Sequence, residues 1–198
     1  MAYRRTPAVQ ARLDDRRETV LRAAAALLAE RGYAGCSVSA VAERAGIATG
    51  SVYQHFTGKT DLAVTLFRTV CGREITAVTE AAERAADPLD GIAALVATFA
   101  ARALQSPRLA YALLAEPADQ DVEAERLVFR RAFRDLIAGR IDRAAALGQL
   151  PAQNAELTAA AIVGAIGEAL VGPLTDGRPP ETVLPDLVTF TLRALGGH

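Results

Sequence analysis

Residues 37–62 read SVSAVAERAGIATGSVYQHFTGKTDL, and this stretch decides the fold. Apolar residues recur at helical spacing through residues 38–45, and Gly46 then interrupts the pattern. A second apolar pair, Val52 and Phe56, follows at an i, i+4 spacing. Two short amphipathic helices joined by a tight glycine turn are the pattern of a helix-turn-helix.

Local signals predict another helix before this pair and set the ends of all three. Asp15 followed by Glu18 forms a capping box, so the first helix is expected to begin at Asp15 and to end at Gly32. Ser37 and Thr49 are expected to cap the next two helices, because a short side-chain oxygen can accept from a free N–H of the first turn. The first 60 residues therefore predict three short helices.

The rest of the chain predicts six further helices and shows no strand-like alternation. Proline, glycine and capping residues bound these segments. The expected ranges are 59–86, 92–105 and 107–116, a long helix through 127–141 that stops at Gly148, then 154–174 and 180–196. The predicted fold class is all-α, with about nine helices.

Charge is distributed unevenly along the chain. Residues 1–60 carry nine Lys/Arg against five Asp/Glu, whereas residues 61–198 carry thirteen against eighteen. An anionic partner is therefore expected to meet the amino-terminal part only, although chance clustering of solvated arginines would give the same count. We expect an amino-terminal helix-turn-helix domain at 1–58, with 1–13 as a flexible arm, and a larger carboxyl-terminal helical domain at 59–198.

Composition points to a cytoplasmic protein. The two cysteines form no CxxC pair, and the first residues lack the apolar core of a signal peptide. The most apolar late segment, residues 157–167, is eleven residues long, which is too short to span a bilayer. We expect no membrane partner.

Polar side chains crowd the second helix of the helix-turn-helix pair. Such a helix enters the major groove of DNA, where base edges present hydrogen-bond donors and acceptors. The residues expected on its outer face, toward base edges, are Thr49, Gly50, Ser51 and Gln54. The residues around its far end, suited to phosphate oxygens, are Tyr53, His55 and Lys59. The helix start at Ser37 would offer backbone N–H groups to another phosphate.

This stretch resembles the TetR family of bacterial transcriptional repressors over about residues 15–65. The residues that carry the resemblance are Gly46, Tyr53, His55, Phe56, Lys59 and Leu62. The resemblance implies that the Tyr, His and Lys contact phosphates and that the outer-face residues approach bases. It also implies a homodimeric repressor that binds double-stranded operator DNA and is released by a small-molecule effector.

Two other functional classes compete with this interpretation. An enzyme is disfavoured, because the two histidines, His55 in the motif and His198 at the carboxyl end, indicate no triad or metal cluster. We expect no catalytic residue, no metal and no cofactor. A helical carrier of a small molecule or lipid, without DNA binding, is the alternative, and it would leave the anisotropy of labelled duplex DNA unchanged.

The last two expected helices predict a second subunit. A helix that is apolar on every side must be buried on every side. The helix over 154–174 has this character, and that over 180–196 has Asp186 and Arg193 as its clear solvent charges. We expect a homodimer through these helices, with two recognition helices about 34 Å apart, against the alternative of a tightly wrapped monomer.

A ligand pocket is hypothesised in the larger domain, where polar groups interrupt apolar helical faces. Its candidate residues are Phe99, Arg102, Tyr111, Phe129, Phe133 and Glu168. If they converge, they would enclose a mainly apolar molecule with a polar or aromatic end. The alternative is that Arg102 and Glu168 face water while the aromatic residues fill a closed core.

Overall fold

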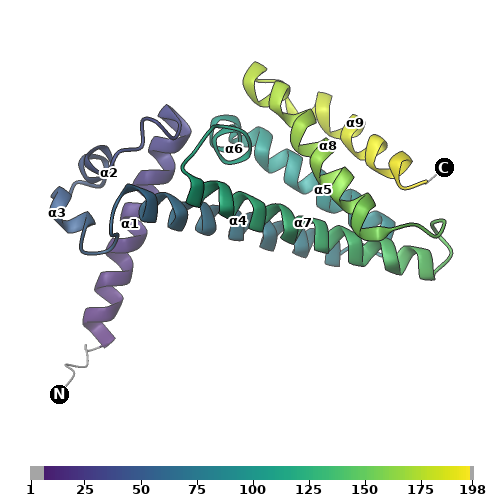
Figure 1. Ribbon diagram of the computed structural model, residues 1–198, viewed down its shortest axis with the longest axis horizontal. Coiled ribbons are helices and arrows are strands. Elements are labelled where there is room, and N and C mark those ends of the chain that lie inside the picture. Colours follow the sequence, from purple (N-terminus) through teal and green to yellow (C-terminus); the bar gives the residue numbers. More distant parts are fainter. Residues whose placement is uncertain (1–6, 197–198) are drawn as a thin grey trace.

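The computed structural model describes residues 7–196 and confirms the all-α fold. Nine helices form over this range, and none of it is strand. They are α1 (Pro7–Arg31), α2 (Val38–Ala45), α3 (Thr49–Val52), α4 (Lys59–Glu83), α5 (Pro88–Gln105), α6 (Pro107–Leu114), α7 (Gln120–Ala146), α8 (Ala155–Asp176) and α9 (Pro180–Ala194). Figure 1 shows an elongated molecule with α1–α3 at one end and α5, α7, α8 and α9 toward the other.

The helix-turn-helix forms where the sequence predicts it. Ser37 is the N-cap of α2, and its side chain accepts from the backbone N–H of Ala40 at 3.2 Å. Gly46 ends α2 with φ +67°, a left-handed conformation that glycine adopts without a steric cost. Val52 and Phe56 both point into the core, at 0% and 2% exposure. Tight apolar packing against α1 and α2 therefore fixes the position of α3.

The predicted start of the first helix is wrong. α1 begins at Pro7, so the helix covers residues 7–13 of the expected arm, while residues 1–6 lie outside the described range. Proline is suited to the first helical turn, and the Ala, Gln, Arg and Leu residues that follow favour a helix. Asp15 is an internal residue whose carbonyl accepts from the Thr19 hydroxyl at 3.0 Å. A capping-box pattern can thus occur inside a helix.

Three other helix starts differ from the sequence expectation, and one of them is that of α7, which begins at Gln120 ahead of the expected 127–141. The N-cap of α3 is Ala48, so Thr49 is the first helical residue and caps nothing. α5 begins at Pro88 instead of residue 92, because Asp87 caps it and accepts from the N–H groups of Leu89 and Asp90 at 2.8 and 3.0 Å. A capping aspartate followed by proline was sufficient to extend that helix.

The apolar core of the amino-terminal helices continues into α4 and α6. Its buried members include Leu27 of α1, Val41 of α2, Leu62 and Leu66 of α4, and Ala112 of α6. α4 then runs on into the rest of the molecule, where it packs against α5 and α7 (Figure 1). The chain division at residue 58 therefore does not coincide with a break in packing, and the domain boundary stays a prediction.

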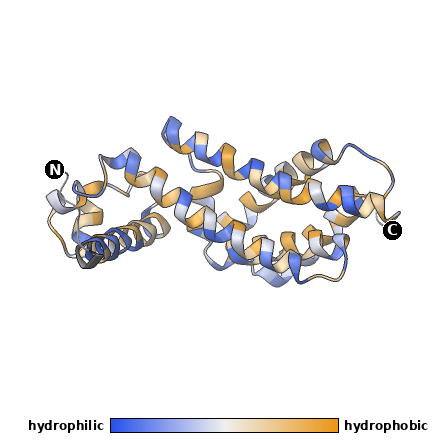
Figure 2. Ribbon diagram, turned by 90° about the horizontal axis from the view of Figure 1, so that it is seen from below, coloured by the Kyte–Doolittle hydropathy of each residue, from blue (hydrophilic) through white to orange (hydrophobic). Residues whose placement is uncertain are grey.

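Helices α4–α9 form a second core, and this part of the molecule is here called the body. α5 packs against α4, α7 and α9, and α8 packs against α6 and α7. Most helices carry hydrophobic residues on one side and hydrophilic residues on another (Figure 2). This layered packing leaves the outer faces of α8 and α9 on the surface.

α8 is more apolar than the eleven-residue segment suggested. By length and composition, it is long and apolar enough to cross a membrane, the one such helix among residues 7–196. Six of its side chains pack into the body core, which is how a core helix of a globular protein passes the same test. Only 28% of its most apolar window is buried, so an apolar face is left exposed.

Candidate nucleic-acid interface and ligand pockets

α3 and the turn after it present polar groups outward, opposite the buried Val52. Of the eight residues expected to meet DNA, five are exposed and three, Ser51, His55 and Lys59, are half-buried. The exposed five are Ser37, Thr49, Gly50, Tyr53 and Gln54. The side chain of Tyr53 is 56% exposed, which is unusual for an aromatic residue that only covers a core edge. This surface can offer hydroxyl, amide and phenol groups to a flat or grooved partner.

Gly50 has no folding reason to be glycine. A Cβ added at this position would meet no protein atom within 4 Å, and its φ is not left-handed. Glycine inside a helix costs about 0.5–1 kcal/mol relative to alanine. An exposed position that carries this cost is suited to close approach of another molecule to the backbone.

The two flanking phosphate candidates are partly occupied by contacts within the protein. The Ser37 side chain caps α2 and lies 3.1 Å from the Ser39 hydroxyl. The Lys59 ammonium lies 4.7 Å from the centre of the Tyr33 ring, a cation–π contact. The sequence reasoning also missed Arg17 of α1, whose guanidinium lies 5.3 Å from the Phe56 ring and adds a cation beside α3.

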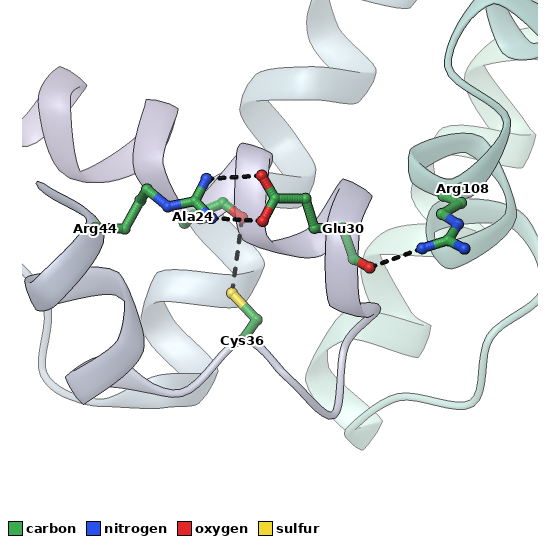
Figure 3. Close-up of polar contacts among 5 residues, drawn as sticks. All are labelled: Ala24, Glu30, Cys36, Arg44 and Arg108. Carbon is green, nitrogen blue, oxygen red and sulfur yellow. Dashed lines mark hydrogen bonds and ion pairs between the residues drawn. The ribbon is translucent and has the colours of Figure 1, made fainter.

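The end of α1 is tied both to α2 and to α6 (Figure 3). The carboxylate of Glu30 accepts two hydrogen bonds from the Arg44 guanidinium of α2, one of them at 2.8 Å. This partner lowers the pKa of Glu30 below its ordinary value. The backbone oxygen of the same residue accepts from Arg108 of α6 at 3.0 Å. One residue thus links the helix-turn-helix to a helix of the body.

A second set of contacts joins the same regions through Tyr33. Its backbone N–H donates to Glu116 at 2.9 Å, and its hydroxyl donates to Asp119 at 2.7 Å. Burial, followed by the hydrogen bond to Asp119, raises the pKa of Tyr33, so the phenol stays a donor. Gly32 has φ +67°, and a Cβ there would lie 2.7 Å from a Glu116 oxygen. The segment after α6 is therefore held against the end of α1.

A cleft lies between α4, α5 and α6, and three of the predicted ligand residues, Phe99, Arg102 and Phe129, line it. Its cavity volume is about 150 Å³. Arg102 does not face water alone, because its guanidinium bonds both oxygens of Glu74 on α4, at 2.6 and 2.8 Å. Burial raises the pKa of the Cys71 thiol in the same wall to about 12, so it stays neutral.

An aromatic cluster separates this cleft from a second cavity between α5, α7 and α8. The ring centres of Phe99 and Phe133 are 4.8 Å apart, and those of Phe129 and Phe133 are 5.0 Å apart. Phe99 and Phe129 line both spaces, whereas Phe133 lines the second only. The aromatic candidates therefore converge and have open space on both sides.

Two predicted ligand residues do not join this group. Tyr111 packs against the body core from α6 and lines neither space. Glu168 is exposed and lines a polar groove between α7 and α8. Sequence spacing identified the aromatic residues correctly as neighbours, but it did not show that Tyr111 and Glu168 line neither of the two spaces.

Comparison with known proteins identifies the amino-terminal helices. Residues 20–66 match the family model described as bacterial regulatory proteins, tetR family. The fatty acid metabolism regulator protein of Bacillus subtilis is 38% identical over 56 residues, which are 28% of this chain and 29% of that protein. The HTH-type transcriptional repressor KstR2 of Mycobacterium tuberculosis is 40% identical over 60 residues, 30% of each chain. These matches span about three tenths of the relatives' length.

Solved structures share the whole fold. The transcriptional regulator FadR of Bacillus subtilis, in complex with stearoyl-CoA, superimposes with a TM-score of 0.78 and 21% identity, covering 91% of this chain and 98% of that one. At this identity the likeness shows the fold alone. The amino-terminal helices thus match the tetR family of bacterial regulatory proteins, and the chain as a whole shares the fold of the FadR structure.

Proposed function

We propose that this chain is a cytoplasmic transcriptional repressor that binds double-stranded operator DNA and releases it when a small molecule fills the body. The observation that carries the proposal is the exposed polar face of α3, rigidly mounted on a core that matches the tetR family model. In such a unit the outer face of the second helix reads the major groove. The matched relatives are regulators rather than enzymes, which supports the same class.

Each exposed side chain has a separate role in the proposal. Thr49, Gly50, Ser51 and Gln54 approach base edges, and Tyr53, His55 and Lys59 hold phosphates together with the start of α2 at Ser37. Phosphate contacts position a protein without reading sequence, whereas base contacts specify it. Arg17 adds a cation at the same edge. The number of formal charges can stay small because hydroxyl and amide groups match the mixed donors and acceptors of base pairs.

A homodimer through α8 and α9 completes the proposal. Leu157 of α8 is 68% exposed and Phe190 of α9 is 46% exposed, and the small exposed Ala161 would allow close approach of another helix. Burying this face against a second copy would satisfy α8 and would place two α3 helices on one side of the DNA. Sedimentation should show a dimer at micromolar concentration, and Ala161→Arg should dissociate it. A stable monomer of the unaltered protein would contradict the dimer.

The two contacts at the end of α1 support a route from ligand to DNA. α4 borders the cleft through Val70, Cys71 and Glu74, and its first turn belongs to the amino-terminal core. α6 borders the same cleft and holds Glu30 through Arg108. A ligand that moves either helix would therefore change the placement of α3. Both α4 and α6 are proposed to carry the signal.

The test is selection of DNA fragments by the purified protein, followed by anisotropy titrations on the selected and a scrambled duplex. Gln54→Ala and Ser51→Ala should weaken binding to the selected duplex by about 1–3 kcal/mol where the contact is good and should barely affect the scrambled one. Tyr53→Phe and Lys59→Ala should weaken both about equally. Failure to select any fragment would favour the ligand carrier without DNA binding.

A further inference from the structure

Tyr33, in the turn between α1 and α2, contacts two other parts of the chain. Its ring lies beside the Lys59 ammonium of α4, which is 4.7 Å from the ring centre. Its hydroxyl donates to Asp119 at 2.7 Å, and its backbone N–H donates to Glu116 at 2.9 Å. Both carboxylates belong to residues 115–119, which join α6 to α7 and are here called the acidic link. One half-buried side chain therefore lies between the acidic link and a lysine proposed to hold a phosphate.

Lys59 stands where its charge does not favour the fold. It is the first residue of α4, and the amino-terminal end of a helix carries a partial positive charge that disfavours a cation. Its ammonium makes no ion pair within residues 7–196. A phosphate from outside would interact favourably with both the ammonium and the helix end. The position therefore suits binding better than it suits stability.

The Tyr33 ring can hold this lysine without cancelling its charge. A carboxylate partner would neutralise the ammonium, whereas an aromatic face attracts it and leaves it positive. The N–H donors that point away from the ring stay available for phosphate oxygens. A lysine side chain loses rotational freedom when it binds, and a ring that already holds it reduces that loss. The contact therefore prepares Lys59 for a phosphate.

Asp119 is turned toward Tyr33 instead of toward its own helix. It is the N-cap residue of α7, where an aspartate normally accepts from an N–H of the first turn, yet its side chain makes no such bond. Its Oδ2 atom accepts from the Tyr33 hydroxyl and from the Thr60 hydroxyl of α4, the latter at 3.2 Å. Because the phenol is fixed beside Thr60, its ring is held next to Lys59.

We propose that Tyr33 is a positioning residue for operator binding, which holds the Lys59 ammonium ready for a phosphate and is itself held by the acidic link. The inference rests on the proposed function, because Lys59 acts on DNA. Tyr33 does not need to touch the duplex. The acidic link continues directly from α6, which is one wall of the cleft beside α4. A shift of α6 would therefore reach a phosphate contact through Asp119 and Glu116 without any change in α3.

The experiment measures the salt dependence of DNA affinity by anisotropy, because the slope of log affinity against log salt counts phosphate contacts. Lys59→Ala should reduce the magnitude of this slope by about 0.9, the value for one contact. Tyr33→Leu removes the ring and the hydroxyl, so it should reduce the slope in the same direction and weaken binding by about twofold to fivefold. In the Lys59→Ala background, Tyr33→Leu should have almost no further effect on the selected or on a scrambled duplex. A merely structural tyrosine would weaken binding in both backgrounds.

The acidic link is tested by removing one hydrogen bond from each of its two ends. Tyr33→Phe and Asp119→Ala should each weaken binding by about twofold, and neither should add to Lys59→Ala. Asp121→Ala is the matched control, because it removes the same charge from the first turn of α7, where Asp121 is exposed and makes no ion pair within residues 7–196. Its effect on the salt dependence is subtracted from that of Asp119→Ala.

Proton NMR of the full-length protein without DNA tests the contact itself. The ring current of Tyr33 should shift the Hε protons of Lys59 upfield from their ordinary position. Tyr33→Leu should abolish this shift, whereas Tyr33→Phe should retain most of it, since the ring remains. Thermal unfolding of each variant measures any accompanying loss of stability.

Two results would overturn the positioning role. The Lys59 protons would be unshifted in the unaltered protein, or the loss caused by Tyr33→Leu would be as large in the Lys59→Ala background as without it. If Tyr33→Leu does not fold, Tyr33→Phe and Asp119→Ala decide by the same comparison. When the unaltered protein binds its operator, these results reject the role of Tyr33 and leave the proposed regulator intact. If the protons are shifted but no duplex is bound, the proposed function fails, and the role of Tyr33 fails with it.

Discussion

The amino-terminal helices and the body differ in how their side chains pack and in where their proposed binding groups lie. Around α3 the core is closed, with Val52 and Phe56 buried, and the groups proposed to meet DNA are side chains that project outward. In the body the proposed ligand site is space between helices, bordered by an aromatic cluster. A projecting site needs a rigid base, whereas a cavity site needs walls that can move. Changes to the two regions should therefore have different consequences.

The largest expected effect comes from removing the base of α3. Phe56→Ala leaves a cavity in the amino-terminal core and should cost about 3–5 kcal/mol. Hydrogen exchange should then accelerate across residues 20–56 and operator binding should be lost, while protection of α5, α7 and α8 persists because their core is a separate cluster. Val128→Ala, at a side chain that is 49% exposed, is the matched control and should change neither.

The same hydrogen-exchange measurement tests whether the amino-terminal helices and the body unfold independently. Leu62, Leu66 and Ala112 connect the amino-terminal core to α4 and α6. If Phe56→Ala accelerates exchange throughout the chain, the two regions unfold as one cooperative unit. The proposed division at residue 58 would then have no thermodynamic meaning.

The second effect concerns the body alone. Phe133→Trp adds volume beside the cavity, where Phe133 is 5% exposed and contacts Phe99 and Phe129. Filling the space should abolish the response to effector while operator affinity stays unchanged. Overpacking should cost about 1–3 kcal/mol of stability, which thermal unfolding would measure. Loss of DNA binding or an unfolded variant would instead assign Phe133 to a closed core.

Sequence reasoning succeeded where one local pattern decides one local structure. Gly46, Val52 and Phe56 predict the turn and the buried side of α3 without reference to any distant residue. The failures at Asp15 and Thr49 have the same local origin, since a capping pattern also fits a helix interior and an uncapped helix can start one residue earlier. Such errors moved helix ends but left every exposed residue of α3 in place.

The ligand space was only partly predictable because it depends on helices that meet from distant parts of the chain. The spacing of Phe129 and Phe133 placed both rings on one face of α7, as observed. Nothing local indicates that Arg130 lines the space beside these rings, because α8 supplies the other wall. The row Arg126, Arg130 and Arg134 at i, i+4 spacing was the available signal, and six arginines on α7 obscured it.

Two exposed glycines, Gly50 of α3 and Gly72 of α4, allow a position at the proposed DNA interface to be compared with an ordinary surface position. Gly50→Ala and Gly72→Ala both add a methyl group that meets no protein atom within 4 Å, and both lie in helices. Each should stabilise the protein by up to about 1 kcal/mol, because alanine loses less conformational freedom than glycine. Gly50→Ala alone should weaken operator binding, by about tenfold, since the methyl group would hold the backbone away from the duplex. Equal operator affinities would remove Gly50 from the interface.

The smallest expected effect tests how the two regions communicate. Arg108 of α6 donates to the Glu30 carbonyl at the end of α1, where a cation also interacts favourably with the helix dipole. The contact is exposed, so Arg108→Ala should change stability by no more than about 1 kcal/mol and operator affinity in the absence of effector hardly at all. The effector should nevertheless reduce operator affinity less than in the unaltered protein, by about twofold to fivefold, because Arg108 would no longer hold the end of α1.

Two control variants accompany Arg108→Ala. Arg108→Lys retains a donor of the same charge and should restore most of the response, whereas Arg73→Ala, on the exposed side of α4, is the neutral control. Anisotropy titrations with and without effector measure the response for each variant. An unchanged response in Arg108→Ala would show that the Arg108–Glu30 contact carries none of the coupling and would leave α4 and the buried contacts of α6 as the connection between cavity and DNA.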